Sequence, residues 1–86
     1  MELPSSDIYV DAILATLRRR PDRDLSFKKT HVVVNRWLEE RGEVPIPGRS
    51  LRLLLEDAGI EIFEAPYGDA LRGIDIQTAV YLRLMR

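Results

Sequence analysis

The 86-residue sequence predicts a single α+β domain over residues 1–86, in which three helices precede a C-terminal antiparallel β-hairpin. Apolar residues recur at helical spacing through the first two thirds of the chain, and they alternate with polar residues in the last third. The two patterns meet at Gly59, where a leucine-rich segment ends and an alternating segment begins. This junction sets the order of the elements, with the helices first and the hairpin last.

The first helix is predicted from about Ser6 to Arg19. Ser5 or Ser6 can cap its first turn, and Pro21 stops it. Its apolar stripe consists of four residues at positions i, i+3, i+4 and i+7, which are Val10, Ile13, Leu14 and Leu17. The arginines at positions 18–20 either match the negative end of the helix dipole or contact phosphate.

The second helix is predicted from its cap at Ser26 to Gly42, and the spacing of Leu25 and Phe27 permits a very short strand before it. The helix has one apolar face, lined by Phe27, Val34, Trp37 and Leu38, with His31 near it. His31 is the only histidine, and one histidine without suitably spaced carboxylates does not make a metal site. We therefore expect no bound metal.

The third helix is predicted from Pro47 to Ala58, and Gly59 ends it. Alternation then predicts a strand over residues 60–65, a loop over residues 66–73 and a second strand over residues 74–84. The two strands are expected to pair as the antiparallel hairpin and to pack on the helices. If the last strand lies at a sheet edge, it could also pair with a second copy of the chain.

This order of elements resembles the winged helix-turn-helix superfamily. The residues that carry the resemblance form an apolar third helix, a glycine and a strand, namely Leu51, Leu54, Leu55, Ala58, Gly59, Ile60 and Ile62. The resemblance implies that the third helix docks in the major groove of DNA while the hairpin, the wing, reaches the backbone or minor groove. Other members use the same fold only to hold proteins together.

The outer face of the third helix is where a partner is expected to bind. Successive helical residues are about 100° apart, which places Arg49, Arg52, Leu53 and Glu56 opposite the leucine stripe. Arginine can read guanine edges or hold phosphate. Leu53 has three explanations of equal weight: ordinary surface, a protein interface, or a cover for the edge of the second helix.

Charge divides the chain into two parts. The formal net charge is −1, which is low for a dedicated DNA-binding domain. Seven Lys or Arg residues face five acids within residues 1–36, whereas residues 60–76 hold four acids and only Arg72. An anionic partner should therefore meet the helices, and the hairpin is acidic.

Composition excludes several classes of protein. The hydrophobic fraction of 45% suits a packed core, and the lack of cysteine excludes disulfides, thiolate metal ligands and thiol nucleophiles. No apolar run approaches the ~18 residues of a membrane span, and the acidic, polar start is unlike a signal peptide. We therefore expect a cytoplasmic protein without a membrane partner. No phosphate-binding glycine loop or catalytic triad is evident, so we expect no enzyme, cofactor or small-molecule substrate.

The sequence thus predicts a small protein that binds double-stranded DNA and regulates transcription or replication. The residues expected to contact nucleic acid are Arg49, Arg52, Lys28, Lys29, Arg36 and Arg72. The alternative is a winged-helix adaptor that binds protein, or a second copy of itself, and does not bind nucleic acid. Leu53 and Val32 are the candidate contacts for that role.

Overall fold

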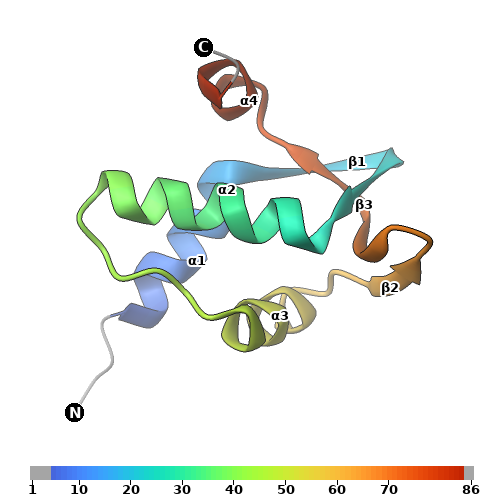
Figure 1. Cartoon of the computed structure of the whole chain (residues 1–86), viewed down its shortest axis with the longest axis horizontal. Helices are drawn as coiled ribbons and strands as arrows, with labels where there is room; N and C mark the ends of the chain where they lie inside the picture. Colours follow the sequence, from blue (N-terminus) through green and yellow to red (C-terminus); the bar gives the residue numbers. More distant parts are fainter. Residues whose placement is uncertain (1–4, 85–86) are drawn as a thin grey trace.

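In the computed structural model, which describes residues 5–84, four helices pack against a three-stranded antiparallel sheet (Figure 1). In chain order the elements are α1 (Ser5–Thr16), β1 (Leu17–Ser26), α2 (Phe27–Glu40), α3 (Gly48–Asp57), β2 (Ile62–Ala65), β3 (Gly68–Ile76) and α4 (Thr78–Leu84). The expected α+β class is confirmed, but β1 and α4 depart from the prediction. No helix in this part of the chain is long and apolar enough to cross a membrane.

Helix α2 crosses the middle of the molecule, with α1 behind it and α3 below it in Figure 1. Ser26 caps α2 as predicted, because its Oγ accepts a hydrogen bond of 3.0 Å from the amide of Lys29. Gly42 follows the helix with a φ of +72°, a left-handed conformation that suits glycine. The largest fully buried apolar side chains are Val33, Val34, Leu38, Ile46, Leu51, Leu55 and Leu71.

The first helix ends earlier than predicted, at Thr16, and the arginines at positions 18–20 lie in β1. Pro21 disfavours a helical conformation at Arg20, so extended backbone is favoured there. Leu17 and Leu25, near the two ends of β1, are both buried in the core. The predicted match between these arginines and a helix dipole is therefore wrong.

The apolar stripe predicted for the first helix is divided between two faces. Ile13 and Leu17 are buried, but Val10 is 43% exposed and Leu14 is 68% exposed. Ala12 and Thr16 are buried on the inner face of α1, where Val10 and Leu14 were expected. The hydroxyl of Thr16 donates to the carbonyl of Ala12 at 2.6 Å. The side chains of Ser5 and Ser6, expected to cap this helix, lie outside the described residues.

Strand β3 lies at the centre of the sheet, which has the order β1-β3-β2. The strand begins at Gly68, after a two-residue turn, so most of the loop predicted over residues 66–73 is strand instead. Strand β1 pairs with β3 on one side, and β2 pairs with residues 68–71 on the other, so β3 is the central strand of the described sheet and not the edge strand that pairing with a second copy was expected to use.

The last predicted strand stops at Ile76, and residues 78–84 form α4 instead. Leu17 is the first residue of β1 and pairs with Ile76, so later residues have no strand beside them. Gln77 closes the strand, because its amide donates to the carbonyl of Thr16 at 2.8 Å and its Nε2 donates to the carbonyl of Leu17 at 3.0 Å. The missing strand partner explains why alternation in the sequence did not produce a strand here.

The connection from α2 to α3 is fixed by side chains of α2. Asn35 accepts a hydrogen bond of 2.8 Å from the buried amide of Ile46, and Nε2 of His31 lies 2.7 Å from the carbonyl oxygen of Ile46. The sequence predicted Pro47 as the first helical residue of α3. Pro47 is instead its N-cap residue, and the helix begins at Gly48. His31 is partly buried at the core edge, and this connection holds α3 in place.

Candidate nucleic-acid interface

The outer face of α3 is the first part of the candidate interface. Of the predicted core stripe, Leu51 and Leu55 are fully buried and Leu54 is partly buried against the core, but Ala58 is exposed beyond the last turn and does not belong to it. The opposite face presents Arg49 and Leu53 to solvent. An exposed helical face with arginine near its start is therefore available to a partner.

Arg52, the second arginine expected on this face, is engaged within the molecule. Its guanidinium is hydrogen-bonded to Asp69 at the start of β3, and it lies 3.9 Å from Oε2 of Glu56. The guanidinium carbon also lies 5.3 Å from the centre of the Phe27 ring, a cation–π distance. Arg52 thus links α3, α2 and the hairpin, and two carboxylates offset its charge.

Arg72, the contact expected from the hairpin, is also paired. Its Nε lies 3.1 Å from Oε1 of Glu61, and its guanidinium carbon lies 4.1 Å from the centre of the Phe63 ring. The pair remains about half exposed, so it adds little to stability. It does lower the positive charge that the hairpin offers to an anionic partner.

Arg49 and Lys28 remain exposed and form no ion pair among the described side chains. Gly48, which precedes Arg49, lies beside the ring of Phe27, which precedes Lys28; a Cβ at Gly48 would lie 3.9 Å from Cε2 of that ring. The start of α3 therefore lies beside the side chains of Phe27 and His31 in the first half of α2. The two helix starts each carry one exposed cation that has no ion pair among the described side chains.

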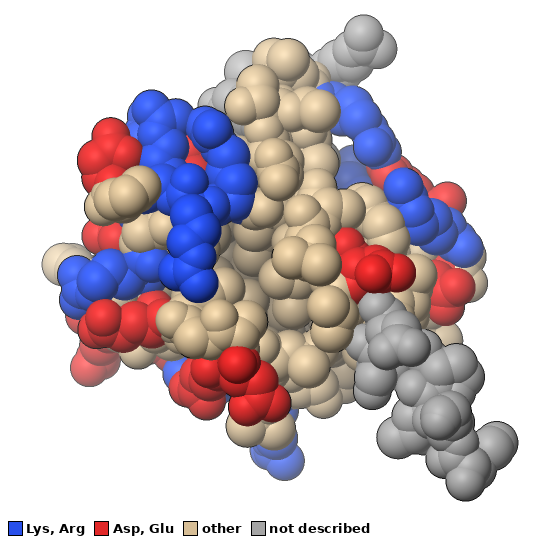
Figure 2. Space-filling view, turned by 180° about the vertical axis from the view of Figure 1, so that it is seen from behind, with Lys and Arg blue, Asp and Glu red and all other residues tan. Residues whose placement is uncertain are grey.

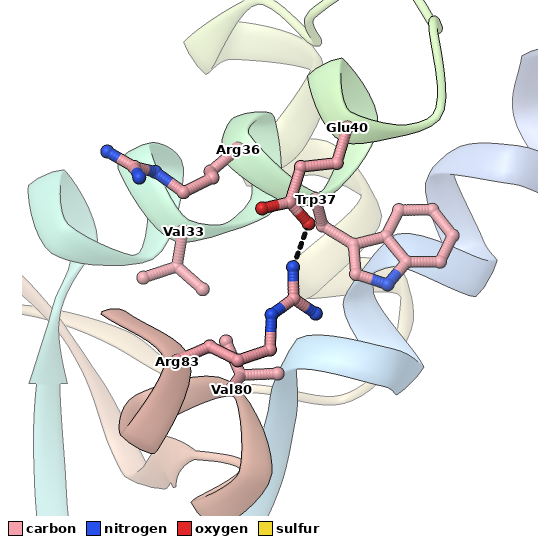
Figure 3. Close-up of a pocket in the computed structure, with 6 residues that line it drawn as sticks. All are labelled: Val33, Arg36, Trp37, Glu40, Val80 and Arg83. Carbon is pink, nitrogen blue, oxygen red and sulfur yellow. Dashed lines mark hydrogen bonds and ion pairs between the residues drawn. The ribbon is translucent and has the colours of Figure 1, made fainter. Parts of the chain in front are cut away.

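Arg36 is separated from this region, because it lines a small cavity of about 50 Å³ between α2 and α4. Figure 3 shows Arg83 of α4 bonded to Glu40 there, with Arg36 extended away from that pair. The hydrogen bond from Arg83 lowers the pKa of the Glu40 carboxyl below its ordinary value of 4.5, although partial burial opposes this shift. This contact joins α2 and α4, and the cavity between them is too small for a ligand.

Lys29 faces a different surface, a polar cleft of about 400 Å³ that it lines together with Arg18, Arg20 and Arg23 of β1. In Figure 2, seen from behind, Lys and Arg side chains gather at the end of the molecule where Figure 1 places the tip of β1. The sequence showed the run of arginines, but only the fold brings Lys29 beside them.

The two candidate protein contacts are both at the surface. Leu53 on α3 is 58% exposed and Val32 on α2 is 57% exposed. An exposure this large argues against the idea that Leu53 covers the edge of the second helix. Ordinary surface and a protein interface remain as the two explanations for it.

Comparison with known proteins adds no relative to this picture. A scan against models of known families, a search of curated proteins and a search of solved structures find no match to this chain.

Proposed function

We propose that the protein is a winged-helix protein that binds double-stranded DNA and regulates transcription or replication. The observation that supports this most directly is the exposed outer face of α3, with Arg49 near its start and without an ion pair among the described side chains. Lys28 in the first turn of α2 is likewise exposed and unpaired there. Helices α1, α2 and α3 also precede the antiparallel hairpin of β2 and β3, which is the order on which the resemblance to the winged helix-turn-helix superfamily rests, with β1 and α4 in addition to it. The major groove is wide enough to admit one α-helix.

In this proposal the two cations have different roles. Arg49, in the first turn of α3, reads a base edge or holds a phosphate through its forked guanidinium. Lys28, in the first turn of α2, contacts the backbone as a compact charge. Arg52 orients α3 through its bond to Asp69 and is a positioning residue.

The hairpin contributes little attraction to DNA in this proposal. Glu61, Glu64 and Asp69 lie on or beside it, and Arg72 is already paired with Glu61. Negative charge close to phosphates is repulsive, so the hairpin should stay at the margin of the complex. The binding surface then consists of the starts of α2 and α3.

A salt titration with duplex DNA tests this function. Each lost phosphate contact should reduce the slope of log affinity against log salt by about 0.9. Lys28→Gln should show this change, and Arg49→Gln should weaken binding by about tenfold, typical of a lost charged hydrogen bond. Arg41→Gln is the control, since Arg41 stacks 3.8 Å from the centre of the Trp37 ring near the opposite end of α2.

Two results would contradict the proposal. One is the absence of duplex binding at low salt by the intact protein. The other is equal weakening of binding by Arg49→Gln and by the control Arg41→Gln, because that would indicate a general charge effect.

A second candidate function is protein binding without nucleic acid, in a winged-helix adaptor. It is favoured by the exposure of Leu53 and Val32 and by the pairing of Arg52 and Arg72 with carboxylates. If the partner is a second copy, light scattering should give twice the chain mass, and Leu53→Asp should restore the monomer. A monomeric mass before and after this substitution would count against self-association through α3.

A further inference from the structure

The polar cleft beside β1 has an unusual charge balance. Its walls come from β1, the start of α2, the end of β3 and Thr78 of α4. Four cations and two carboxylates line it, namely Arg18, Arg20, Arg23, Lys29, Asp24 and Asp75. Like charges at short range repel one another, so such a cluster is more stable with an anion among them.

One wall of the cleft is formed by an irregular part of β1. Pairing between β1 and β3 stops after Arg19↔Ile74 and resumes at Asp24↔Arg72, so residues 20–23 bulge out opposite Gly73. Oδ1 of Asp24 accepts a hydrogen bond of 3.1 Å from the amide of Gly73 and ties the two strands together across the bulge. The bulge thus brings Arg20 and Arg23 into the lining of the cleft.

The carboxylates of the cleft form no ion pairs with its cations. Asp24 is bonded to the Gly73 amide, and Oδ1 of Asp75 accepts from the amide of Ile76 at 2.8 Å. Among the described side chains, neither carboxylate lies within 4.0 Å of a cationic nitrogen. Arg20 pairs with Asp22, at 3.3 Å on the exposed bulge.

Three of the four cations have no ion-pair partner in the described part of the chain. Arg18, Arg23 and Lys29 form no ion pair there. The Nε of Arg18 is also buried and has no hydrogen-bond partner among these residues. A buried donor without a partner is costly, and an acceptor atom of a bound ligand would remove that cost.

We propose that this cleft binds a phosphate group of a nucleotide or of a nucleic-acid strand. Arginine forks and a lysine ammonium suit the several acceptor oxygens of a phosphate. A volume of about 400 Å³ also leaves room for groups attached to the phosphate. Neither Arg49 nor Lys28 lines this cleft, so phosphate binding there does not depend on the proposed function.

Amide chemical shifts in an isotope-labelled sample test the site. Inorganic phosphate is added at constant ionic strength, with sodium chloride in the reference series. We expect saturable shifts confined to the cleft lining and the bulge, that is residues 18–20, 22–25, 75, 76 and 78 together with Lys29 and Gly73. Arg23→Gln and Lys29→Gln should each weaken phosphate binding by about tenfold, the usual effect of a lost charged hydrogen bond.

Two further variants separate a site from general charge. Arg41→Gln removes one exposed arginine elsewhere and should leave phosphate binding unchanged. Arg23→Lys keeps the charge and should retain binding within about threefold, a loss of under 1 kcal/mol. If Arg23→Gln fails to fold, the exposed Lys29 provides the same test from α2.

The source of the phosphate is determined in two arms, with a nucleoside monophosphate and with a short single-stranded oligonucleotide. Tighter binding of the oligonucleotide indicates a strand, and equal binding indicates a free nucleotide; either outcome supports the site. Shifts that do not saturate, that spread over cations outside the cleft, or that weaken equally in Arg41→Gln overturn it. Loss of duplex-DNA binding in Arg49→Gln alone tests the proposed function of α3. It does not bear on phosphate binding in the cleft.

Discussion

Gly73 is the residue at which the central strand accommodates the arginine-rich bulge. Its φ is +68°, a left-handed conformation that costs other residues about 1–2 kcal/mol. A Cβ there would lie 3.7 Å from Cα of Pro21, an ordinary contact, so the cost of a side chain comes from backbone strain. The bulge therefore depends on glycine for its conformation.

Substitution of this glycine has a predictable cost. We expect Gly73→Ala to lower the free energy of unfolding by about 1–2 kcal/mol. Thermal denaturation should show this as a fall in Tm of about 4–8 °C for each kcal/mol. Gly48→Ala is the control, because its φ is not left-handed and its Cβ would lie 3.6 Å from Cε1 of His31. If Gly48→Ala lowers the free energy of unfolding as much as Gly73→Ala does, backbone strain is not the cause.

At the scale of elements, α1 has two apolar faces with different surroundings. Ile13 is 8% exposed and packs in the core, whereas the next residue, Leu14, is 68% exposed. Helix α1 lies behind α2 in Figure 1 and so faces the viewer in Figure 2, where a tract of uncharged residues runs down the middle. Sequence periodicity alone does not distinguish these two faces.

Substitution on each face should separate them. Ile13→Ala should destabilise the protein by about 2–5 kcal/mol through a core cavity, measured by urea denaturation. Leu14→Lys should stay within about 0.5 kcal/mol of the original protein, because it changes a solvent-facing position. A large loss of stability in Leu14→Lys would mean that the outer face of α1 is covered in solution.

Helix α4 is held on α2 partly by charge, which predicts a response to pH. The hydrogen bond from Arg83 lowers the pKa of Glu40 in the folded state below 4.5. The stabilisation is therefore present above the unfolded pKa and is lost as the pH falls through the folded pKa. We expect the protection of amides in residues 78–84 from hydrogen exchange, corrected for the intrinsic rate at each pH, to fall on acidification relative to the core of α2.

Arg83→Gln is the control for this response. It removes the hydrogen bond to Glu40, so the exchange protection of α4 should already be lower at neutral pH and should depend less on pH. The same acid response in Arg83→Gln and in the original protein would show that another group is responsible.

At the scale of the whole molecule, one core joins the helices and the sheet, so unfolding should be cooperative. Trp37 is the only tryptophan, and it lies partly buried on α2 against the core. Tryptophan fluorescence and far-ultraviolet circular dichroism should therefore give coincident urea transitions. A fluorescence transition at lower urea would mean that α4 separates from α2 before the rest unfolds.

The whole molecule also has two cationic regions that belong to different elements. Arg49 and Lys28 stand at the starts of α3 and α2, while the cleft gathers arginines of β1 with Lys29. Lys28 and Lys29 are adjacent in sequence but about 100° apart around the helix. Adjacent lysines can therefore serve different surfaces.

Local sequence determined much of this protein. The cap at Ser26, the glycine that follows α2 and the leucine stripe of α3 depend on chemistry within a few residues, and the structure has all of them. The exposed positions of Arg49 and Leu53 follow from the same helical periodicity. These features were predictable because their physical causes are local.

Only the tertiary structure decided the rest. Residues 78–84 alternate like a strand but form α4, because the last residue of the ladder, Ile76, already pairs with Leu17. Arg52 is occupied because the fold brings Asp69 to it, and the cleft exists because the bulge of β1 comes to lie beside α2. Strand partners, distant ion pairs and converging cations depend on which segments meet in space. Composition and periodicity along the chain do not encode that proximity directly.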